Sequence, residues 1–271
     1  MLIEPGLRVL TWGWKRRILI LAVVALLAAT IYAFWIEPYW IEVTHHTISA
    51  PLASPIKIAH LTDLHTYGLG RRELKMLEVL KAEQPDLIAI TGDSISVSSN
   101  YPGLRDVLSQ MHAPLGVWIV RGNHEDWYPI KDEQEFYKFA GTTLLLNSSR
   151  EVCPGVWLVG FDDLFGGKPD ADKGFGGVPE SAYKIALFHS PTFIESAAGR
   201  CDLALAGHTH GGQVRIPFVG PLWLPPFSGE FVAGWFEREG TRMYVSRGVG
   251  TSILDVRFLS RPEIAIITVG P

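Results

Sequence analysis

The sequence predicts an α/β domain with a two-sheet core, preceded by one transmembrane helix. Between residues 56 and 120, short apolar runs alternate with amphipathic stretches at about 30 residues per unit, the spacing of strand–helix–strand construction. Further apolar runs follow, enough for a second sheet. An uncharged run at 18–36 stands before all of them. We therefore expect a single domain over 52–271.

Composition is that of a globular protein. The chain has 271 residues, of which 19% are charged and 47% hydrophobic, and a formal net charge of −4. Since no basic stripe follows residue 20, nucleic acid is not expected as a partner. Two cysteines, Cys153 and Cys201, form no disulfide framework. They could pair in an oxidising compartment, but the simpler expectation is two small buried apolar residues.

The run 18–36 has the length of a membrane-spanning helix. Its 19 residues cover about the 30 Å of a bilayer's hydrocarbon core. A cleaved signal peptide is one alternative, but the run shows no small-x-small cleavage site. A buried core helix is the other, and the basic cluster at 15–17 argues against it. We expect an uncleaved anchor, flanked by the interfacial aromatic residues Trp12, Trp14, Trp35, Tyr39 and Trp40.

Charge is distributed unequally around this anchor. Glu37 and Glu42 follow it, with no Lys or Arg until Lys57, whereas the basic residues Arg8, Lys15, Arg16 and Arg17 precede it. The positive-inside rule therefore places 1–17 in the cytoplasm. We expect a single-pass protein of the cell (inner) membrane, with a linker at 37–51 and an extracytoplasmic catalytic domain.

The elements of the domain follow from periodicity, in chain order. Leu74, Leu77 and Leu80 share one face of a helix expected over 71–83, which Pro85 helps to close. A shorter helix is expected around 104–111. The apolar runs expected as strands are 56–61, 86–91, 116–120, 156–161, 184–189, 203–207, 242–246 and 264–269.

Five of these strands end in, or are closely followed by, His, Asp, Asn or Glu residues. Open α/β sheets place their sites beyond the carboxyl ends of strands, so these residues should converge. Imidazoles with carboxylates and an amide oxygen suit Mn²⁺, Fe or Zn²⁺, and not a structural zinc site. Any single member could instead be a turn or capping residue. The metal-ligand candidates are Asp63, His65, Asp93, Asn123, His189, His208 and His210, with His124 and Glu125 beside them. Seven ligands are too many for one ion, so we expect two ions bridged by Asp93.

The order D-x-H, G-D, G-N-H-E, a lone His and G-H-T-H resembles the calcineurin-like metallophosphoesterase superfamily over about residues 55–270. The stretches "GHTHGGQVRIP" and "VSRGVGTS" resemble its membrane-anchored bacterial branch, which includes proteins similar to UDP-2,3-diacylglucosamine pyrophosphatases of lipid A synthesis. The resemblance implies a four-layer α/β/β/α sandwich and a phosphoric ester or anhydride hydrolase. Asp255 stands where this branch would have Pro, which puts the shape of its loop in question.

The same resemblance implies a role for each site residue. Asp63, His65, Asp93 and His210 would hold the first metal ion, and Asp93, Asn123, His189 and His208 the second. His124 would contact the scissile phosphate and assist the leaving group. Glu125, where many relatives carry Asp, would orient His124.

The expected function is hydrolysis of a phosphodiester or pyrophosphate bond in a lipid-linked or membrane-proximal substrate. Two divalent ions, Mn²⁺ foremost and Fe or Zn²⁺ as alternatives, would activate water and neutralise phosphoryl oxygens. A UDP-2,3-diacylglucosamine pyrophosphatase is the alternative within the enzyme class, but its substrate is cytoplasmic and the expected orientation is outward. The alternative from another class is an inactive membrane-tethered metal-binding scaffold, which predicts a missing ligand, whereas none is missing.

The segment "IPFVGPLWLPPF", 216–227, follows the last metal motif. Its four prolines exclude a helix and argue against a central strand. We expect an irregular apolar loop whose side chains form an exposed lip for an acylated substrate or the bilayer surface. The alternative is that the loop packs on the domain's own sheet. The substrate-binding candidates are Phe218, Leu222, Trp223 and Phe227 of this loop, together with Arg247.

Overall fold

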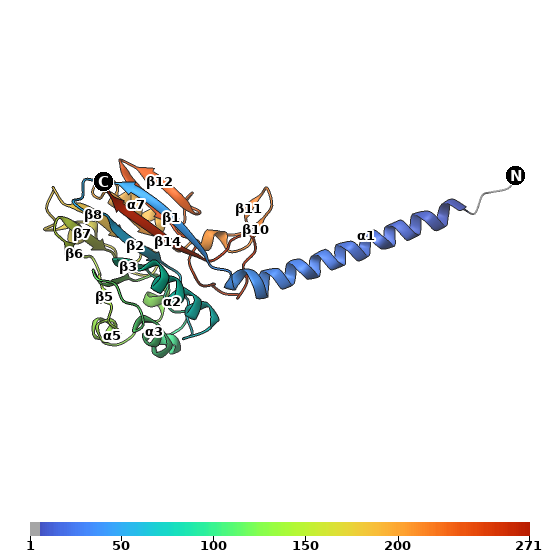
Figure 1. Ribbon diagram of the computed structural model, residues 1–271, viewed down its shortest axis with the longest axis horizontal. Coiled ribbons are helices and arrows are strands. Elements are labelled where there is room, and N and C mark those ends of the chain that lie inside the picture. The colour runs from blue at the N-terminus through green and yellow to red at the C-terminus, as the bar shows by residue number, and fades with distance from the viewer. Residues whose placement is uncertain (1–5) are drawn as a thin grey trace.

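Two six-stranded sheets pack face to face in the computed structural model, which describes residues 6–271 (Figure 1). The expected cytoplasmic segment 1–17 therefore lies partly outside the described residues. In the first sheet, the strand order is β1 (Glu42–Ser49), β14 (Glu263–Gly270), β2 (Ile56–Leu61), β3 (Leu87–Thr91), β4 (Val117–Val120) and β5 (Thr143–Leu144). In the second sheet, it is β12 (Gly234–Arg238), β13 (Thr241–Val245), β9 (Leu203–Ala206), β8 (Tyr183–Leu187), β7 (Val156–Gly160) and β6 (Ser148–Cys153).

Helices cover the outer faces of both sheets, which gives the four-layer α/β/β/α sandwich that the sequence predicts. The helices α2 (Arg71–Glu83) and α3 (Tyr101–Leu108) pack on the first sheet through Met76, Leu80 and Leu104. The second sheet carries α6 (Ala171–Phe175) and α7 (Ile194–Ala197). Between the sheets, apolar side chains from both inner faces form one core that includes Ile58, Leu87, Leu158 and Ile185.

The parallel strands point their carboxyl ends toward one edge of each sheet. The pairs β2–β3, β3–β4, β7–β8 and β8–β9 are all parallel. Each of these strands is buried along nearly its whole length, as expected for parallel strands covered on both faces. The loops that leave them carry the candidate ligands. Two short helices, α4 (Asn123–Trp127) and α5 (Glu133–Phe139), follow β4.

The linker expected at 37–51 was wrong for most of its length. Residues 42–49 form β1, which pairs in parallel with β14 from Glu42↔Glu263 to Ser49↔Gly270. The domain therefore begins well before residue 52. The sequence of this segment does not predict a strand, because it carries two histidines and lacks the apolar run of a fully buried strand. In the structure it lies at the sheet edge and is only partly buried. Its pairing partner lies more than 200 positions away in the chain.

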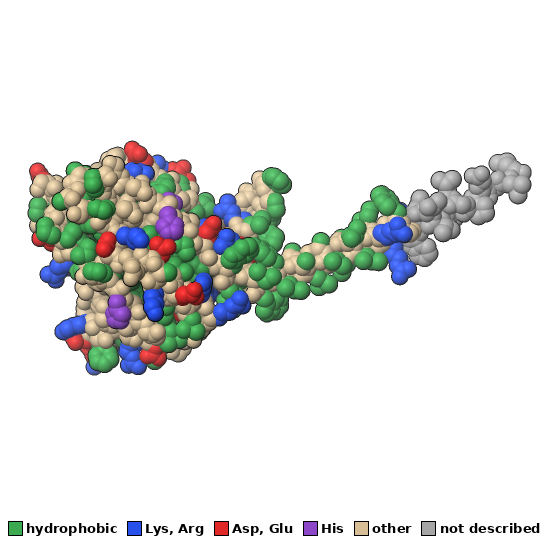
Figure 2. Space-filling view, viewed as in Figure 1, with side chains coloured by type: hydrophobic (Ala, Val, Ile, Leu, Met, Phe, Trp, Pro, Cys, Tyr) green, Lys and Arg blue, Asp and Glu red, His purple; other side chains and the backbone are tan. Residues whose placement is uncertain are grey.

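The apolar N-terminal run is helical and stands clear of the domain (Figure 1). Helix α1 (Gly6–Ile31) continues through a π-helical turn (Tyr32–Ile36) and a 3₁₀ turn (Glu37–Tyr39) into β1. By length and composition, the stretch Gly13–Tyr39 could cross a membrane, and little of it is buried against the domain. Its far end carries basic side chains, while apolar ones cover its length (Figure 2).

The end of this helix is fixed to the domain. Glu37 is fully buried, and its carboxylate accepts hydrogen bonds from the backbone N–H groups of Leu259 (2.9 Å) and Ser260. The N–H of Arg257 donates to the carbonyl of Ala33 at 3.0 Å. The chain therefore passes from helix to domain through a hydrogen-bonded junction.

Candidate metal centre

The candidate ligands sit on sharp turns directly after their strands. Five of them have positive φ angles between 42° and 73°: Asp63, His65, Asp93, His208 and His210. Non-glycine residues rarely adopt this left-handed conformation, and where they do the strain often marks a functional site. The turns allow side chains from successive loop positions to point into one place at the sheet edge.

A first group joins the ends of β2 and β9. The Nε2 atom of His210 lies 3.2 Å from Asp63 Oδ1 and 3.3 Å from His65 Nε2. All three side chains are buried. Their potential ligand atoms all lie within 4.8 Å of one another, close enough to hold one metal ion.

A second group joins the ends of β3, β8 and β9. Asp93 Oδ2 lies 3.3 Å from His189 Nε2, which in turn lies 3.1 Å from His208 Nδ1. These atoms also fall within 4.8 Å of one another. Asp93 Oδ2 lies 3.6 Å from His65 Nε2, so this carboxylate stands between the two groups.

The donor atoms fit a pair of cations. Two buried oxygens, Asp63 Oδ1 and Asn123 Oδ1, have no hydrogen-bond partner among the described residues, and buried acceptors in native proteins are nearly always satisfied. His189 Nδ1 lies 2.7 Å from the carbonyl of Thr91, which can only accept, so Nδ1 carries the proton and Nε2 faces the site. His208 Nε2 similarly donates to the carbonyl of Pro226, which leaves Nδ1 facing inward. Such fixed tautomers are typical of metal-ligating histidines.

Electrostatics separate the charged from the neutral groups. Burial raises the pKa of Asp63, but the His210 and His189 imidazoles outweigh it and bring that pKa below its usual range. Burial lowers the pKa of His65 to about 3, so this imidazole is neutral at physiological pH. A neutral imidazole beside an ionised carboxylate is the protonation state that a divalent ion requires.

His124 lies at the edge of the two groups. Its Nε2 atom is 3.9 Å from Asp93 Oδ2, and its side chain is only partly buried. Its Nδ1 atom lies 3.0 Å from the carbonyl of Ser96 and therefore donates to it. The free nitrogen thus faces the site. Because His65, Asp93 and His124 also come within ligand distance of one another, geometry alone does not bar His124 from a metal.

Glu125 was expected to orient His124, and the structure gives it different partners. Its Oε2 atom accepts hydrogen bonds from the N–H groups of Asp93 and Gly122, both at 2.9 Å, and its Oε1 atom accepts from Ser94 at 2.7 Å. It thereby joins the turn after β3 to the start of α4. The longer side chain reaches past His124 to the neighbouring backbone, and the ring is held by Ser96 instead. Burial and the nearby Asp93 charge raise the pKa of Glu125 to about 8.

Two supporting residues were not anticipated. Fully buried Arg257 donates to the carbonyls of Gly250 and Ser260, and so braces the loop between β13 and β14. Asp163 is buried and accepts a hydrogen bond from the Ser190 hydroxyl, next to His189. Both are ordinary residue types in positions without a motif, so only the fold reveals them.

The apolar loop 216–227 is partly regular and largely exposed. A small ladder pairs β10 (Arg215–Ile216) with β11 (Gly220–Pro221), where an irregular loop was expected. Phe218, Leu222 and Trp223 are exposed, so the alternative of packing on the sheet fails for them. Phe227 is less exposed and contacts the Phe165 ring at a centroid distance of 5.3 Å.

Arg247 is held by two glutamates in the structure. Its guanidinium forms ion pairs with Glu42 (2.8 Å) and Glu263 (3.1 Å), on the first strand and the last. Since one of its partners lies on the unanticipated β1, this engagement could not be read from the sequence. Arg247 thereby joins β1 to β14, and a role in substrate binding stays a prediction.

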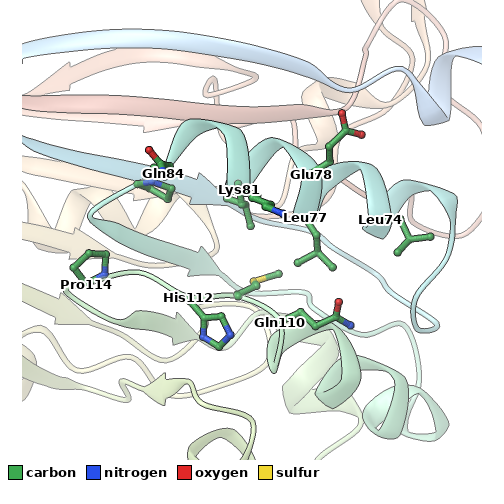
Figure 3. Close-up of a pocket in the computed structure, with 11 residues that line it drawn as sticks. Leu74, Leu77, Glu78, Lys81, Gln84, Gln110, His112 and Pro114 are labelled. Atoms are coloured by element: carbon green, nitrogen blue, oxygen red, sulfur yellow. The ribbon is translucent and has the colours of Figure 1, made fainter.

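Two hollows open beside the metal groups. A groove of about 890 Å³ runs from His124 and Ser96 to Trp35 and Tyr39 at the anchor junction. A smaller apolar hollow of about 210 Å³ lies between His210, Trp223 and Leu254. A third, of about 690 Å³, lies between α2 and the 110–114 segment (Figure 3). Its lining, which includes Leu77 and His112, contains none of the candidate ligands among the described residues, so we do not assign the site to it.

Comparison with known proteins gives one consistent result. A family model described as calcineurin-like phosphoesterase matches residues 56–212. The metallophosphoesterase YkuE of Bacillus subtilis is 31% identical and covers 88% of each chain. Phosphodiesterase YaeI of Escherichia coli is 32% identical over 87% of this chain and 91% of its own. A metallophosphoesterase of Aquifex aeolicus is 31% identical over 86% of this chain and 94% of its own.

Proposed function

This chain belongs to the calcineurin-like phosphoesterase family and is a metal-dependent hydrolase, and from that premise we propose that it cleaves phosphodiester bonds with two divalent metal ions. The observation that carries the proposal is the placement of the Asp93 carboxylate between two groups of buried ligands. Asp63, His65 and His210 would hold one ion and Asn123, His189 and His208 the other, with Asp93 shared. Mn²⁺ is the first choice for this mixed nitrogen and oxygen set, with Fe or Zn²⁺ as alternatives.

The bound ions would supply charge neutralisation at the phosphoryl oxygens and a water acidic enough to react at neutral pH. The protein's own residues position the site and supply a proton donor. Asp93 holds the two halves of the site at a fixed separation, and Glu125 fixes the backbone on which Asp93 stands. The Nε2 atom of His124, when the ring carries a second proton there, is the group positioned to give that proton to the departing alcohol, because Nδ1–H is engaged by the Ser96 carbonyl.

We further propose that the substrate is lipid-linked or membrane-proximal. The apolar hollow beside His210 suits an acyl or isoprenoid chain, and the larger groove joins His124 to the anchor junction. The charge asymmetry around α1 supports an inner-membrane anchor at 18–36 with the domain on the extracytoplasmic side. That orientation favours a lipid diester over UDP-2,3-diacylglucosamine, whose pyrophosphate is cytoplasmic. The inactive-scaffold alternative predicts a missing ligand, whereas the six expected His and Asp ligands lie within the two groups and Asn123 Oδ1 is buried without a hydrogen-bond partner among the described residues.

The test is a substrate and metal screen on the full chain in detergent. After chelation, the enzyme is reloaded with Mn²⁺, Fe²⁺ or Zn²⁺ and assayed on a small aryl diester, an aryl monoester, UDP-2,3-diacylglucosamine and a phospholipid diester. We expect diester turnover to return with metal, with the phospholipid preferred. Asp93→Asn is the matched inactive control. A preference for the monoester, or turnover without metal, would overturn the proposal.

The orientation has its own test. Phe139 is exposed on α5, and in spheroplasts a Phe139→Cys variant should react with a membrane-impermeant maleimide. Labelling only after the cells are lysed would place the domain in the cytoplasm and restore the nucleotide-sugar alternative.

A further inference from the structure

Apolar side chains are exposed around the junction between α1 and the domain, on segments far apart in the sequence. Phe218, Val219, Leu222 and Trp223 come from the β10–β11 hairpin and its exit, and Ile253 and Leu254 from a later turn. We call these six side chains the apolar rim. Trp35, Ile36 and Trp40 are exposed at the end of the anchor itself. In Figure 2, hydrophobic side chains gather at the hairpin and where the helix leaves the domain.

The cavities show that these segments are neighbours. Ile253 and Leu254 line the apolar hollow together with Leu222 and Trp223. The same two residues line the larger groove together with Trp35 of the anchor. The rim therefore borders both hollows that lead to the metal groups, and it adjoins the anchor.

The backbone holds the tips of the rim outward at a cost in conformational energy. Phe218 and Ile253 both have φ near 66°, a region unfavourable for any side chain and especially for a β-branched one. Ile253 is 89% exposed and Phe218 is fully exposed, so no packing within the described part of the chain offsets this cost. Strain of this kind persists where function requires it.

The apolar rim contains no charged residue, and basic residues lie next to it. Neither 216–227 nor 251–254 includes Asp, Glu, Lys or Arg. Arg215 is the first residue of the hairpin, and Arg71 is exposed next to the larger groove. Apolar and aromatic tips backed by basic side chains are the composition of surfaces that enter the interfacial layer of a bilayer.

The junction fixes the angle between the anchor and the rim. Besides the Glu37 hydrogen bonds, the Tyr39 hydroxyl donates to Asp255 at 3.2 Å, on the turn that carries Ile253 and Leu254. Tyr32 meets Phe258 edge to face at a centroid distance of 6.2 Å, and Phe258 bridges to Val214 just before the hairpin. Asp255, the departure from the family pattern, thus ties the second segment of the rim to the anchor.

We propose that the apolar rim is a second membrane contact, which enters the interfacial layer of the leaflet from which α1 emerges. The occupant of this surface is the lipid bilayer, because the helix proposed to cross it continues into the same junction. The metal centre then opens toward that leaflet, and a membrane lipid reaches it without leaving the interface. The inference rests on the anchoring part of the proposed function, and not on the reaction.

The test measures the depth of single labelled cysteines in the full chain reconstituted into phosphatidylcholine–phosphatidylglycerol vesicles. Cys153 is partly exposed, so the background carries Cys153→Ser, whereas buried Cys201 stays. A fluorophore is attached at Phe218→Cys or Ile253→Cys. Phe139→Cys is the matched control, an exposed phenylalanine on α5. Leu26→Cys, within α1, reports anchoring itself.

Quenching by nitroxide lipids is the readout, with the nitroxide near the headgroup for positions 218, 253 and 139 and near the end of the acyl chain for position 26. We expect severalfold stronger quenching at 218 and 253 than at 139, with an unchanged pattern in an Asp93→Asn background. Quenching at position 26 without quenching at 218 or 253 would contradict membrane contact by the apolar rim, but it would still support α1 as a membrane anchor. No quenching at 26 would overturn both. Protection of 218 that depends on protein density, without lipid quenching, would show that a second copy covers the rim. None of these outcomes depends on activity, so they differ from a failure of the proposed reaction.

Discussion

The carboxylate of Glu125 accepts a hydrogen bond from the backbone N–H of Asp93 at 2.9 Å. The preceding residue of α4 is also bonded to Asp93, because the N–H of His124 donates to Asp93 Oδ1 at 2.9 Å. The proposed shared ligand and the proposed proton donor are therefore parts of one hydrogen-bonded unit. A substitution at Glu125 should therefore displace Asp93 and His124 without altering the side chain of either residue.

Glu125→Gln should weaken metal binding and turnover together. The amide NH₂ group of Gln cannot accept from the N–H donors that the second carboxylate oxygen now satisfies, so the turn bearing Asp93 should shift. We expect a loss of about 10- to 100-fold in metal affinity or turnover, as for other residues that support metal ligands. Metal titration and steady-state kinetics on aryl diesters measure it. The dependence on leaving-group pKa should not change, and a steeper dependence would restore Glu125 as a partner of the His124 ring.

Asp93→Ala and Asn123→Ala should differ in metal content. Asp93 stands between both groups, so its loss should release most metal and abolish activity. Asn123 offers one oxygen to one group, so its loss should mainly weaken a single ion. Elemental analysis of both proteins after dialysis tests this. Two full equivalents retained in Asp93→Ala would contradict the shared-ligand assignment.

His124→Asn should keep the metal and lose most of kcat. A positioned general acid contributes about 10²- to 10⁴-fold. The loss should shrink for p-nitrophenolate and grow for alkyl leaving groups, which need the proton more. Comparing the two substrate series with metal analysis measures this. If metal content falls with activity, His124 is a ligand.

Acid should destabilise the protein partly through His60. Burial lowers the pKa of this fully buried histidine from 6.5 to about 4. The unfolded chain therefore binds the proton first, and stability present above pH 6.5 is lost as the pH falls toward 4, by up to about 3 kcal/mol. His60→Leu loses a hydrogen bond to Thr91 but should show a smaller drop in unfolding free energy between pH 7.5 and pH 4.5. Denaturant titration in detergent at both values checks it. An unchanged drop would mean that other groups carry the acid sensitivity.

Trp223→Ser combined with Phe227→Ser should change the ratio of two activities. If these side chains receive an acyl chain, turnover of a lipid-like diester in vesicles should fall severalfold more than turnover of a small soluble diester. Leu74→Ser, at an exposed leucine on the hollow without ligands, is the control. An equal loss on both substrates would favour a packing role.

The sequence predicts the inner strands well, and it predicts that the candidate ligands follow them, for physical reasons. The parallel strands are buried on both faces, so their apolar runs stand out, and β2 was expected over its observed bounds. The ligand types follow these runs because turns at strand ends are where an α/β sheet builds sites. Each of the seven candidates lies in or beside the cluster.

The missed features depend on partners distant in the chain. β1 pairs with β14, and the sequence around β1 cannot indicate that distant partner. The two histidines of β1 also give the segment the composition of a linker. Arg247 was predicted to bind substrate, and its ion pair with Glu42 could not be predicted because Glu42 lies on β1. Glu125 has two methylenes, and whether it reaches a ring or a backbone depends on a turn that only the fold defines.

The position of β14 between β1 and β2 has a consequence for biosynthesis. Thr44 on β1 contacts Glu263 on β14, 219 positions later, so the ribosome completes nearly the whole domain before the first sheet can close. Until then, two strands next to the apolar N-terminal helix expose unpaired edges, which are templates for association with other chains. Contacts this distant also slow folding. The nascent chain should therefore depend on a holding chaperone near its site of synthesis or export, and premature termination before residue 263 should give an aggregating product instead of a partly active one.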